Sequence, residues 1–160
     1  MPSLAIPDTS CFIGLACGRL LDLLPNLYAD VLVPRGVAAE FGEALPSWAS
    51  VAIVGDTHLV QALRSSLGLG ESEVIALALE REDTIAILDD LRARRMAREL
   101  GVRFTGTAGI LLKAKSAGLL ASVADAMVAM APSGFRFSDE LRNEILRLAG
   151  EDPASERRTR

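Results

Sequence analysis

Residues 84–90, with the sequence TIAILDD, contain the clearest strand of the chain and end in two acids. Apolar and β-branched residues fill residues 84–88 without alternation, which is typical of a strand buried on both faces of a parallel sheet. Similar segments lie along the chain: LAI at 4–6, VLVP at 31–34, SVAIV at 50–54 and the weaker VRFTG at 102–106. Because helical patterns separate these strands, the sequence predicts an α/β fold, a three-layer α/β/α domain with a central, mostly parallel sheet.

The segments between and after the strands carry apolar residues at helical spacing. The first helix is predicted from Ser10, and its apolar positions continue to Leu23. The sequence GLGESEVIALALE predicts a later helix that starts at Glu71. The last predicted helix carries an apolar stripe at Phe137, Leu141, Ile145 and Leu148. Such a stripe must be covered, and we expect the domain's own sheet to cover it.

The composition predicts one folded domain. The chain has 160 residues, of which 50% are hydrophobic and 24% are charged, and this suits a single domain with one substantial core. We place that domain at residues 1–150. The segment EDPASERRTR at 151–160 is charged and lacks apolar anchors, so we expect it to be a mobile tail.

Other features bear on where the protein acts. No apolar run approaches the roughly 20 residues that cross a bilayer, and the stretch MPSLAIPDTS lacks a signal-peptide core. We therefore expect a cytoplasmic protein without membrane contact. Cys11 and Cys17 fall on different faces of the predicted first helix, and we expect both to be reduced core residues. We expect His58 at the surface.

Acids follow two of the predicted strands directly. Asp8 comes after the first strand, and Asp89 and Asp90 come after the fourth. The carboxyl ends of parallel strands meet at one edge of a sheet, where α/β proteins bind their ligands. Glu40 lies among apolar residues in the helix after the second strand, and Glu71 begins a helix that leads to the fourth. The sequence therefore predicts a group of acids at one edge.

Each of these acids alone also has a structural explanation, as a helix cap, a partner of a helix dipole or a turn residue. Together they would repel one another unless a cation compensates the charge. The chain has one histidine and no cysteine cluster, so a hard divalent ion, Mg²⁺ or Mn²⁺, suits the donor set. The pattern therefore indicates metal-assisted phosphoryl chemistry.

A basic cluster follows the acid pair. The net charge of −4 gives no general attraction to nucleic acid, but the sequence LRARRMAR places four arginines within about two helical turns. They are Arg92, Arg94, Arg95 and Arg98. Two interpretations stay open: a phosphate-binding face, with Arg92 and Arg95 as RNA contacts, or a solvated helix face. In either case we expect Arg98 to face partly inward.

Five motifs follow one another along the chain: IPDTSCFIGLA, VPRGVAAEF, LGLGESEVIALALE and AILDDLRARRMARELG, followed by RFTGTAGILLKAK. With these motifs in this order, the chain resembles a PIN-domain protein. The sequence is most similar to the PIN-like toxins of type II toxin-antitoxin modules, and the resemblance extends over residues 4–150. It implies a PIN-like nuclease domain at residues 1–150 that acts as a metal-dependent ribonuclease.

The resemblance also implies roles for single residues. Asp8 matches the first-strand acid, and Ser10 occupies the hydroxyl position that supports it. Glu40 matches the acid of the second motif. Glu71 aligns with the third, and Glu73 is the close alternative.

The fourth family motif departs from its usual form. It is usually Thr-x-Asp, and Leu88 stands here in place of the threonine. The choice between Asp89 and Asp90 therefore stays open, with Asp90 in the family's spacing. Ions bound by Asp8, Glu40, Glu71 and Asp90 would activate a water for in-line attack on RNA. No side-chain nucleophile is needed.

The resemblance further implies an RNA substrate, a homodimer and an antitoxin protein that covers the acidic cleft. Two alternatives remain. A PIN fold can keep its acids and serve as a nucleic-acid or protein binding module without catalysis. A receiver-type phosphoacceptor domain also has acids at strand ends, but it would want the acid pair after the first strand, whereas here the pair comes late.

Overall fold

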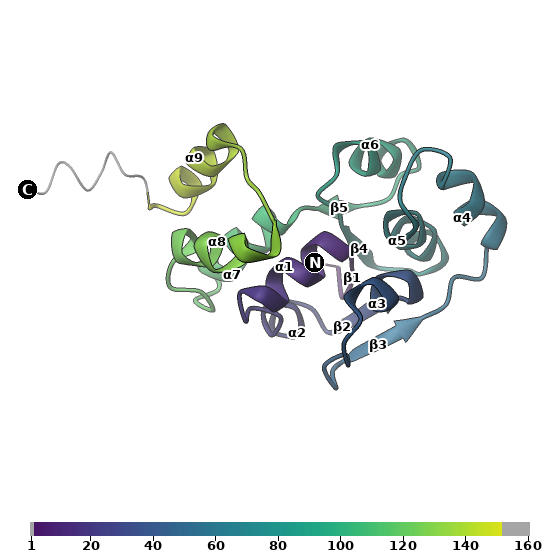
Figure 1. The fold of residues 1–160 in the computed structure, drawn as a ribbon, viewed down its shortest axis with the longest axis horizontal. Helices are drawn as coiled ribbons and strands as arrows, with labels where there is room; N and C mark the ends of the chain where they lie inside the picture. Colours follow the sequence, from purple (N-terminus) through teal and green to yellow (C-terminus); the bar gives the residue numbers. More distant parts are fainter. Residues whose placement is uncertain (1, 152–160) are drawn as a thin grey trace, which may run out of the picture.

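The computed structural model describes residues 2–151 and has a sheet between two layers of helices (Figure 1). The five strands are β1 (Leu4–Pro7), β2 (Asp30–Pro34), β3 (Ala49–Ala52), β4 (Thr84–Ile87) and β5 (Phe104–Thr105). All neighbouring pairs are parallel, in the order β3-β2-β1-β4-β5. The predicted three-layer α/β/α class is therefore confirmed, and the sheet is parallel throughout the described residues.

The strand order places the candidate site. The chain moves outward from β1 through β2 to β3, and then returns to β4 on the other side of β1. The order therefore reverses between β1 and β4, and in such sheets the ligand crevice lies at the carboxyl ends of the strands at this point. Receiver-type domains have the order 2-1-3-4-5 instead. The sheet order thus argues against the receiver-type alternative.

Helices connect and follow the strands. They are α1 (Thr9–Cys17), α2 (Leu23–Leu27), α3 (Arg35–Phe41), α4 (Thr57–Leu63), α5 (Leu69–Glu80), α6 (Leu91–Glu99), α7 (Thr107–Ser116), α8 (Val123–Met130), the 3₁₀ turn η1 (Ala131–Ser133) and α9 (Asp139–Leu148). Right-handed crossovers put α1–α3 on one face of the sheet and α4–α6 on the other. None of the helices within residues 2–151 has the length and apolar character that crossing a membrane requires.

The core fixes the strand ends on which the acids lie. Ile6 of β1, Ile87 of β4 and the following Leu88 are all fully buried. Burial of an aliphatic side chain of this size stabilises a fold by about 1.5 to 3 kcal/mol. The ends of β1 and β4, which lead into Asp8 and Asp89, are therefore anchored in the core.

The first helix is shorter than the sequence predicted. Helix α1 ends at Cys17, where Arg19 adopts a left-handed backbone with φ of 57° and the Leu20 N–H donates to the Leu15 carbonyl at 2.7 Å. This Schellman-type ending stops the helix although apolar residues continue at helical spacing. Leu23 belongs to the separate helix α2. The expectation for Cys17 was also wrong, because its side chain is exposed, whereas Cys11 is buried.

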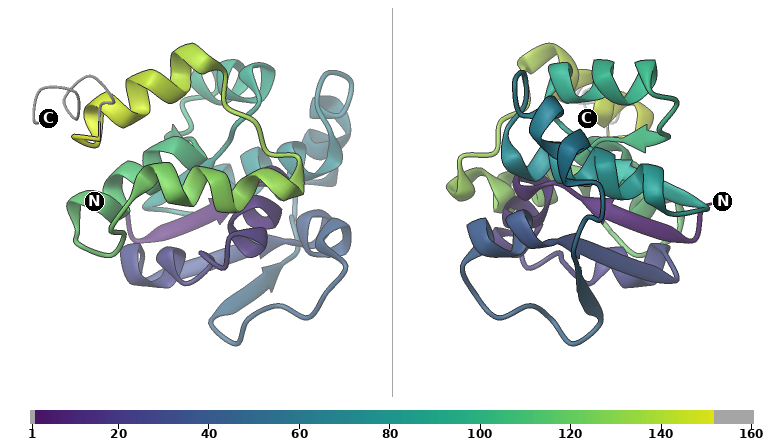
Figure 2. Two further views of the ribbon diagram at one scale, coloured as in Figure 1. Left: turned by 60° about the vertical axis from the view of Figure 1, so that its left-hand side comes forward. Right: turned by 90° about the vertical axis from the view of Figure 1, so that its right-hand side faces the viewer.

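The last helices form a group on one side of the molecule. Helix α7 packs against α2 and β5, α8 packs against α1, and α9 packs on α7 and α8 (Figure 2). The prediction that α9 covers the sheet was therefore wrong. Ile145 and the neighbouring Leu146 are buried against the other helices, while Leu141 and Leu148 remain 46% and 57% exposed. The apolar stripe is thus only partly covered.

Candidate active site

Asp8 lies directly after β1 and is only 2% exposed. Its Oδ1 accepts the Cys11 N–H at 2.8 Å, which makes it the N-cap of α1, as one explanation of the sequence predicted. Its Oδ2 accepts the Asp89 N–H at 3.1 Å. One carboxylate therefore ties the start of α1 to the end of β4.

The charge on Asp8 is unfavourable where it lies. Burial, and next the negative charge of Asp89, raise the pKa of Asp8 to about 7. The N–H groups of Cys11 and Asp89 oppose this rise, and the charge of Glu71 adds to it. A carboxyl group with such a pKa holds a proton easily, and a cation nearby would favour its ionised form instead.

Asp89 is held next to Asp8 by the start of α7. Its Oδ1 accepts the Thr107 N–H at 2.8 Å, and its Oδ2 accepts the Thr107 hydroxyl at 2.6 Å. Burial raises the pKa of Asp89, whereas the two Thr107 bonds and the charge of Arg94 lower it. Thr107 is fully buried, and the sequence analysis missed its role. A threonine after a glycine at a helix start gave no signal beyond an ordinary helix boundary.

Asp90 is exposed and caps α6. Its Oδ1 accepts the N–H groups of Arg92 and Ala93 at 2.8 and 3.0 Å. Its charge nevertheless reaches the other acids, because it raises the pKa of Glu71. Of the two candidates for the fourth acid, Asp89 is the one bonded to Asp8, and Asp90 has a capping role of its own.

Glu71 and Glu40 come from the other two predicted motifs. Glu71 lies in the first turn of α5, which begins two residues earlier than predicted, and its Oε2 accepts the Gly68 N–H at 3.0 Å. Burial raises the pKa of Glu71, the Gly68 N–H lowers it, and the charges of Asp90 and Glu40 raise it further. Glu40 on α3 is exposed. All the predicted acids therefore influence one another, directly or through Glu71.

Glu73 has a different place. Its Oε2 accepts the N–H of Gly36 in the first turn of α3 at 2.6 Å. A Cβ atom at Gly36 would lie 2.8 Å from this oxygen, so only glycine leaves room for the contact. Glu73 thus fixes α5 against α3. It does not line the pocket that holds Asp8, Glu40 and Glu71.

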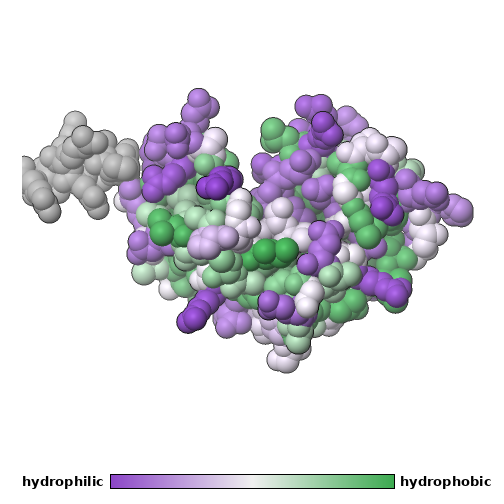
Figure 3. Space-filling model, in the orientation of Figure 1, coloured by the Kyte–Doolittle hydropathy of each residue, from purple (hydrophilic) through white to green (hydrophobic). Residues whose placement is uncertain are grey.

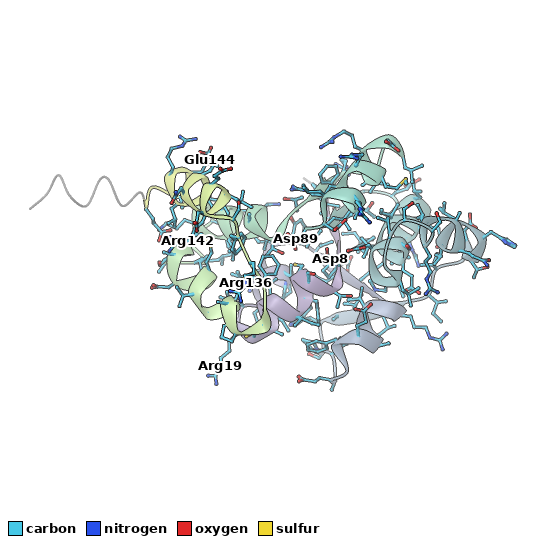
Figure 4. The ribbon with its side chains drawn as sticks, turned by 45° about the horizontal axis from the view of Figure 1, so that its top comes forward. Asp8, Arg19, Asp89, Arg136, Arg142 and Glu144 are labelled. Carbon is cyan, nitrogen blue, oxygen red and sulfur yellow. The ribbon has the colours of Figure 1, made fainter. Side chains whose placement is uncertain are left out.

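A pocket of about 300 Å³ is lined by three of the acids, Asp8, Glu40 and Glu71, whereas Asp89 and Asp90 lie outside its lining. It is lined by Asp8, Thr9, Ser10, Ile13, Glu40, Gly68, Gly70, Glu71, Ser133, Gly134 and Phe135. Ser10 therefore lies where the sequence predicted. Figure 4 shows Asp8 and Asp89 close together between α9 and α6, and in the space-filling view the molecule is notched between the same two helices (Figure 3).

A buried hydroxyl group in the pocket has no hydrogen-bond partner within residues 2–151. It is Oγ1 of Thr9, and a Cβ atom at Gly70 would approach it to 2.7 Å and Oε1 of Glu40 to 3.5 Å. A buried polar group without a partner marks a place where a bound water, ion or ligand completes the hydrogen bonding. The glycine leaves space for such a species between α1, α3 and α5.

The four arginines of α6 divide into two pairs. Arg94 and Arg98 lie over the Phe104 ring, with guanidinium carbons 5.3 and 5.4 Å from its centroid. Arg94, rather than the predicted Arg98, is the more buried of these two, and Arg98 is exposed. Arg92 and Arg95 line a separate hollow of about 420 Å³ with Ser65 and Ser66 among its other residues.

The fit of a metal ion depends on how many direct ligands it needs. Within residues 2–151, no three acid, histidine or cysteine side chains are arranged to hold an ion together. Mg²⁺, however, keeps several waters and commonly takes only one or two carboxylates directly. Asp8 and Asp89 meet this requirement, since burial raises both pKa values and each oxygen that accepts one hydrogen bond has a second lone pair. The residues present therefore fit a hydrated divalent ion.

Comparison with known families identifies the chain. A family model described as PIN domain matches residues 4–151, which include all strands of the sheet and all the acids described above. No curated protein and no solved structure gave a significant match. With the all-parallel sheet and the acids at the β1–β4 edge, the match leads to one conclusion: the chain belongs to the PIN domain family.

Proposed function

We propose that this protein is a metal-dependent ribonuclease that hydrolyses RNA phosphodiester bonds at the pocket over Asp8. PIN domains are typically nucleases, which supports the hydrolytic part of the proposal. The observation that carries the proposal is the hydrogen-bonded contact of Asp8 with Asp89, in which burial and a neighbouring charge bring the pKa of Asp8 to about 7. Such an arrangement suits a site that binds a cation.

The residues have separate roles in this proposal. Asp8 and Asp89 would hold Mg²⁺ or Mn²⁺, and Glu40 and Glu71 would add negative charge at the pocket wall. When bound, the ion supplies Lewis acidity toward phosphate oxygens and makes water acidic enough to attack at neutral pH. Thr107 keeps Asp89 oriented and lowers its pKa, because its N–H and hydroxyl both donate to the carboxylate. Ser10 and Thr9 contribute hydroxyl groups to the pocket lining, and that of Thr9 is buried.

RNA phosphates need positive charge close to this site. Arg92 and Arg95 belong to α6, which begins directly after Asp90, and both line an open hollow beside it. We propose that they bind flanking phosphates. Arg94 is instead part of the site's own electrostatics, because its charge lowers the pKa of Asp89.

The test is cleavage of single-stranded RNA by the purified protein with Mn²⁺, with Mg²⁺ and with EDTA. Wild type should cleave only with a divalent ion, and Asp8→Asn and Asp89→Asn should abolish cleavage while the circular dichroism spectrum stays unchanged. Full activity in both variants would contradict the proposal. RNA binding without cleavage under all these conditions would favour the binding-module alternative.

We also propose that the protein is the toxin of a toxin-antitoxin module and forms a homodimer. The apolar side chains left exposed on α8 and α9, among them Val128 at 66%, support an association surface. An antitoxin arginine would satisfy the paired carboxylates of Asp8 and Asp89 bidentately, in the place of the metal. Sedimentation at micromolar concentration should show a dimer, and the product of a small adjacent gene should inhibit cleavage in competition with Mn²⁺. A monomer, or inhibition indifferent to metal, would count against these assignments.

A further inference from the structure

The pocket over Asp8 has two walls of different chemical character. One wall carries the acids Asp8, Glu40 and Glu71. The wall on the side of η1 is formed by Ser133, Gly134 and Phe135, and Ile13 of α1 adds a second apolar side chain. A nucleotide is divided in the same way, because its phosphate is charged and its base is a flat, largely apolar ring.

The backbone around Phe135 fixes where this ring lies. Gly134 ends η1 in a left-handed conformation with φ of 87°, which L side chains rarely adopt. The Ser133 hydroxyl donates to the Met130 carbonyl at 2.7 Å and accepts the Phe135 N–H at 3.3 Å. The turn therefore presents Phe135 in one direction.

Packing supports the ring from behind. A Cβ atom at Gly14 of α1 would lie 3.0 Å from Cδ2 of Phe135 and 2.9 Å from Cε of Met130. Because Gly14 has no side chain, the Phe135 ring can pack closely against α1 at this position. The Phe137 ring lies 4.9 Å from that of Phe135, centroid to centroid, at an interplanar angle of 49°. The ring is thus held against α1 and Phe137, while Phe135 as a residue is partly exposed and belongs to the pocket lining.

We propose that Phe135 is a stacking platform for one unpaired nucleobase of the RNA substrate. The inference rests on the proposed ribonuclease function and adds to it the residue that would hold a base. A volume of about 300 Å³ is at the small end of ligand pockets, which suits a single nucleotide. Bases within a duplex are stacked on their neighbours, whereas single strands and loops can splay a base onto an aromatic side chain. A base that stacks on Phe135 therefore has to be unpaired.

The experiment measures binding and cleavage separately. Binding is measured by fluorescence anisotropy in the full-length Asp89→Asn background with Mn²⁺, using a short single-stranded RNA and a set of copies that each lack one base. The background protein should lose affinity for the copy that lacks the stacked base. Phe135→Leu should bind intact RNA roughly 5- to 150-fold more weakly and be indifferent to that same missing base.

Two further variants separate stacking from a purely structural role. Phe137→Leu also removes the contact between the rings of Phe135 and Phe137, and Phe137 lies in the same segment of the chain. Because Phe137 does not line the pocket, this variant should keep its sensitivity to the missing base. Phe135→Tyr retains an aromatic ring, so this variant should also keep the sensitivity to the missing base. If Phe135 only anchored the segment, Phe135→Leu would weaken all RNAs by the same factor.

The outcomes distinguish the stacking role of Phe135 from the ribonuclease function. Coupling between Phe135 and one base, together with cleavage by wild type, supports both. In another outcome, wild type cleaves the RNA, but the effects of Phe135→Leu and of each missing base on binding are additive. This result overturns the stacking role and still supports the ribonuclease proposal. Coupled binding without cleavage by wild type supports stacking and removes the ribonuclease proposal. A wild type that neither binds nor cleaves the RNA overturns the stacking role as well.

Discussion

The Asp8 carboxylate accepts a hydrogen bond from the backbone N–H of Asp89 at 3.1 Å, although 81 positions separate the two residues. Both follow core strands whose last residues are buried, so neither acid can move away without disturbing the sheet. The fold therefore imposes the repulsion between them. A cation that binds here is favoured because it relieves an unfavourable interaction that the fold itself creates.

The stability of the metal-free protein should depend on pH through Asp8. The pKa of Asp8 is about 7 in the fold, against an ordinary value of 3.8 for an aspartate. Between these values the folded protein holds a proton that the unfolded chain has released, so the free energy of unfolding falls as pH rises. The contribution of Asp8 is complete below about pH 4 and is lost through about pH 7, on the order of 4 kcal/mol in all. Melting temperatures in EDTA across this range measure the effect.

Asp8→Asn is the control for this pH dependence. It should flatten the decline, although its single side-chain oxygen leaves either the Cys11 or the Asp89 N–H without an acceptor. Mn²⁺ should restore stability to wild type mainly at alkaline pH, where the carboxylates are ionised. An equal slope in wild type and variant would assign the effect to other groups.

Neutralising Asp89 should affect cleavage more than neutralising Asp90. Asparagine at 89 can still accept the Thr107 N–H and donate to its hydroxyl, so the fold should persist while cleavage falls by at least about 100-fold. Asp90→Asn keeps a good helix cap and should retain most activity. The measurement is the initial rate with Mn²⁺ for both variants.

Asp90→Ala serves as the matched variant without the cap. It should lower the stability by about 1 kcal/mol, because the N–H groups of Arg92 and Ala93 lose their acceptor. If Asp90→Asn proved as inactive as Asp89→Asn, Asp90 would be a ligand in its own right, as the family's spacing implied.

Removing the Thr107 hydroxyl should shift the acid limb of the pH–rate profile upward. Thr107→Val keeps the shape of a fully buried side chain but loses the bond that lowers the pKa of Asp89. Thr107→Ser retains this bond and should retain the wild-type profile. Identical profiles for the valine and serine variants would show that the hydroxyl does not control the ionisation of Asp89.

The two glutamates of the first turns of α5 should separate into a site role and a structural role. Glu71→Gln should weaken the apparent affinity for Mn²⁺ with little change in melting temperature. Glu73→Ala should instead destabilise the protein by about 1 to 3 kcal/mol, because the part-buried Gly36 N–H loses its acceptor. Titration calorimetry and thermal melts measure the two effects. A reversed pattern would exchange the assigned roles.

The salt dependence of RNA binding tests the arginines of α6. An Arg92→Ala, Arg95→Ala double variant should reduce the log–log salt slope by up to about 1.4, since each phosphate contact with a single strand contributes about 0.7. The control is an Arg81→Ala, Arg103→Ala variant, which removes equal charge just before β4 and β5, at the opposite edge of the sheet. Equal slopes for both double variants would leave Arg92 and Arg95 as a solvated face.

Much of the site follows from local sequence because the parallel fold converts chain order into position. An apolar run that ends in an acid predicts both the strand and the edge, and in the structure Asp8 and Asp89 lie at that edge, at the ends of β1 and β4. Helical spacing also placed Glu40 and Glu71, since each follows a recognisable strand or glycine break. These predictions need only the spacing of apolar residues along the chain and the fact that ligand sites lie at the carboxyl ends of parallel strands.

The remaining features depend on contacts that local patterns do not encode. Asp89 and Asp90 are adjacent in sequence, and only the folded structure shows that Asp89 is bonded to both Asp8 and Thr107. The end of α1 depends on the left-handed Arg19, which an apolar helical pattern does not reveal. Phe135 became visible as a pocket wall only with the fold, because its segment crosses from α8 to α9 beside α1.

The wall at Phe135 also has a consequence for synthesis. A ribosome makes Asp8 early and Phe135 more than 120 residues later, so the pocket cannot be complete while translation is still within the α/β core. Domains fold as units once their segments are available. Under the proposed function, a nascent chain would therefore lack the wall that holds the base until the segment after α8 has been made. The order of the sequence would then keep RNA binding incomplete until nearly the whole domain has been synthesised.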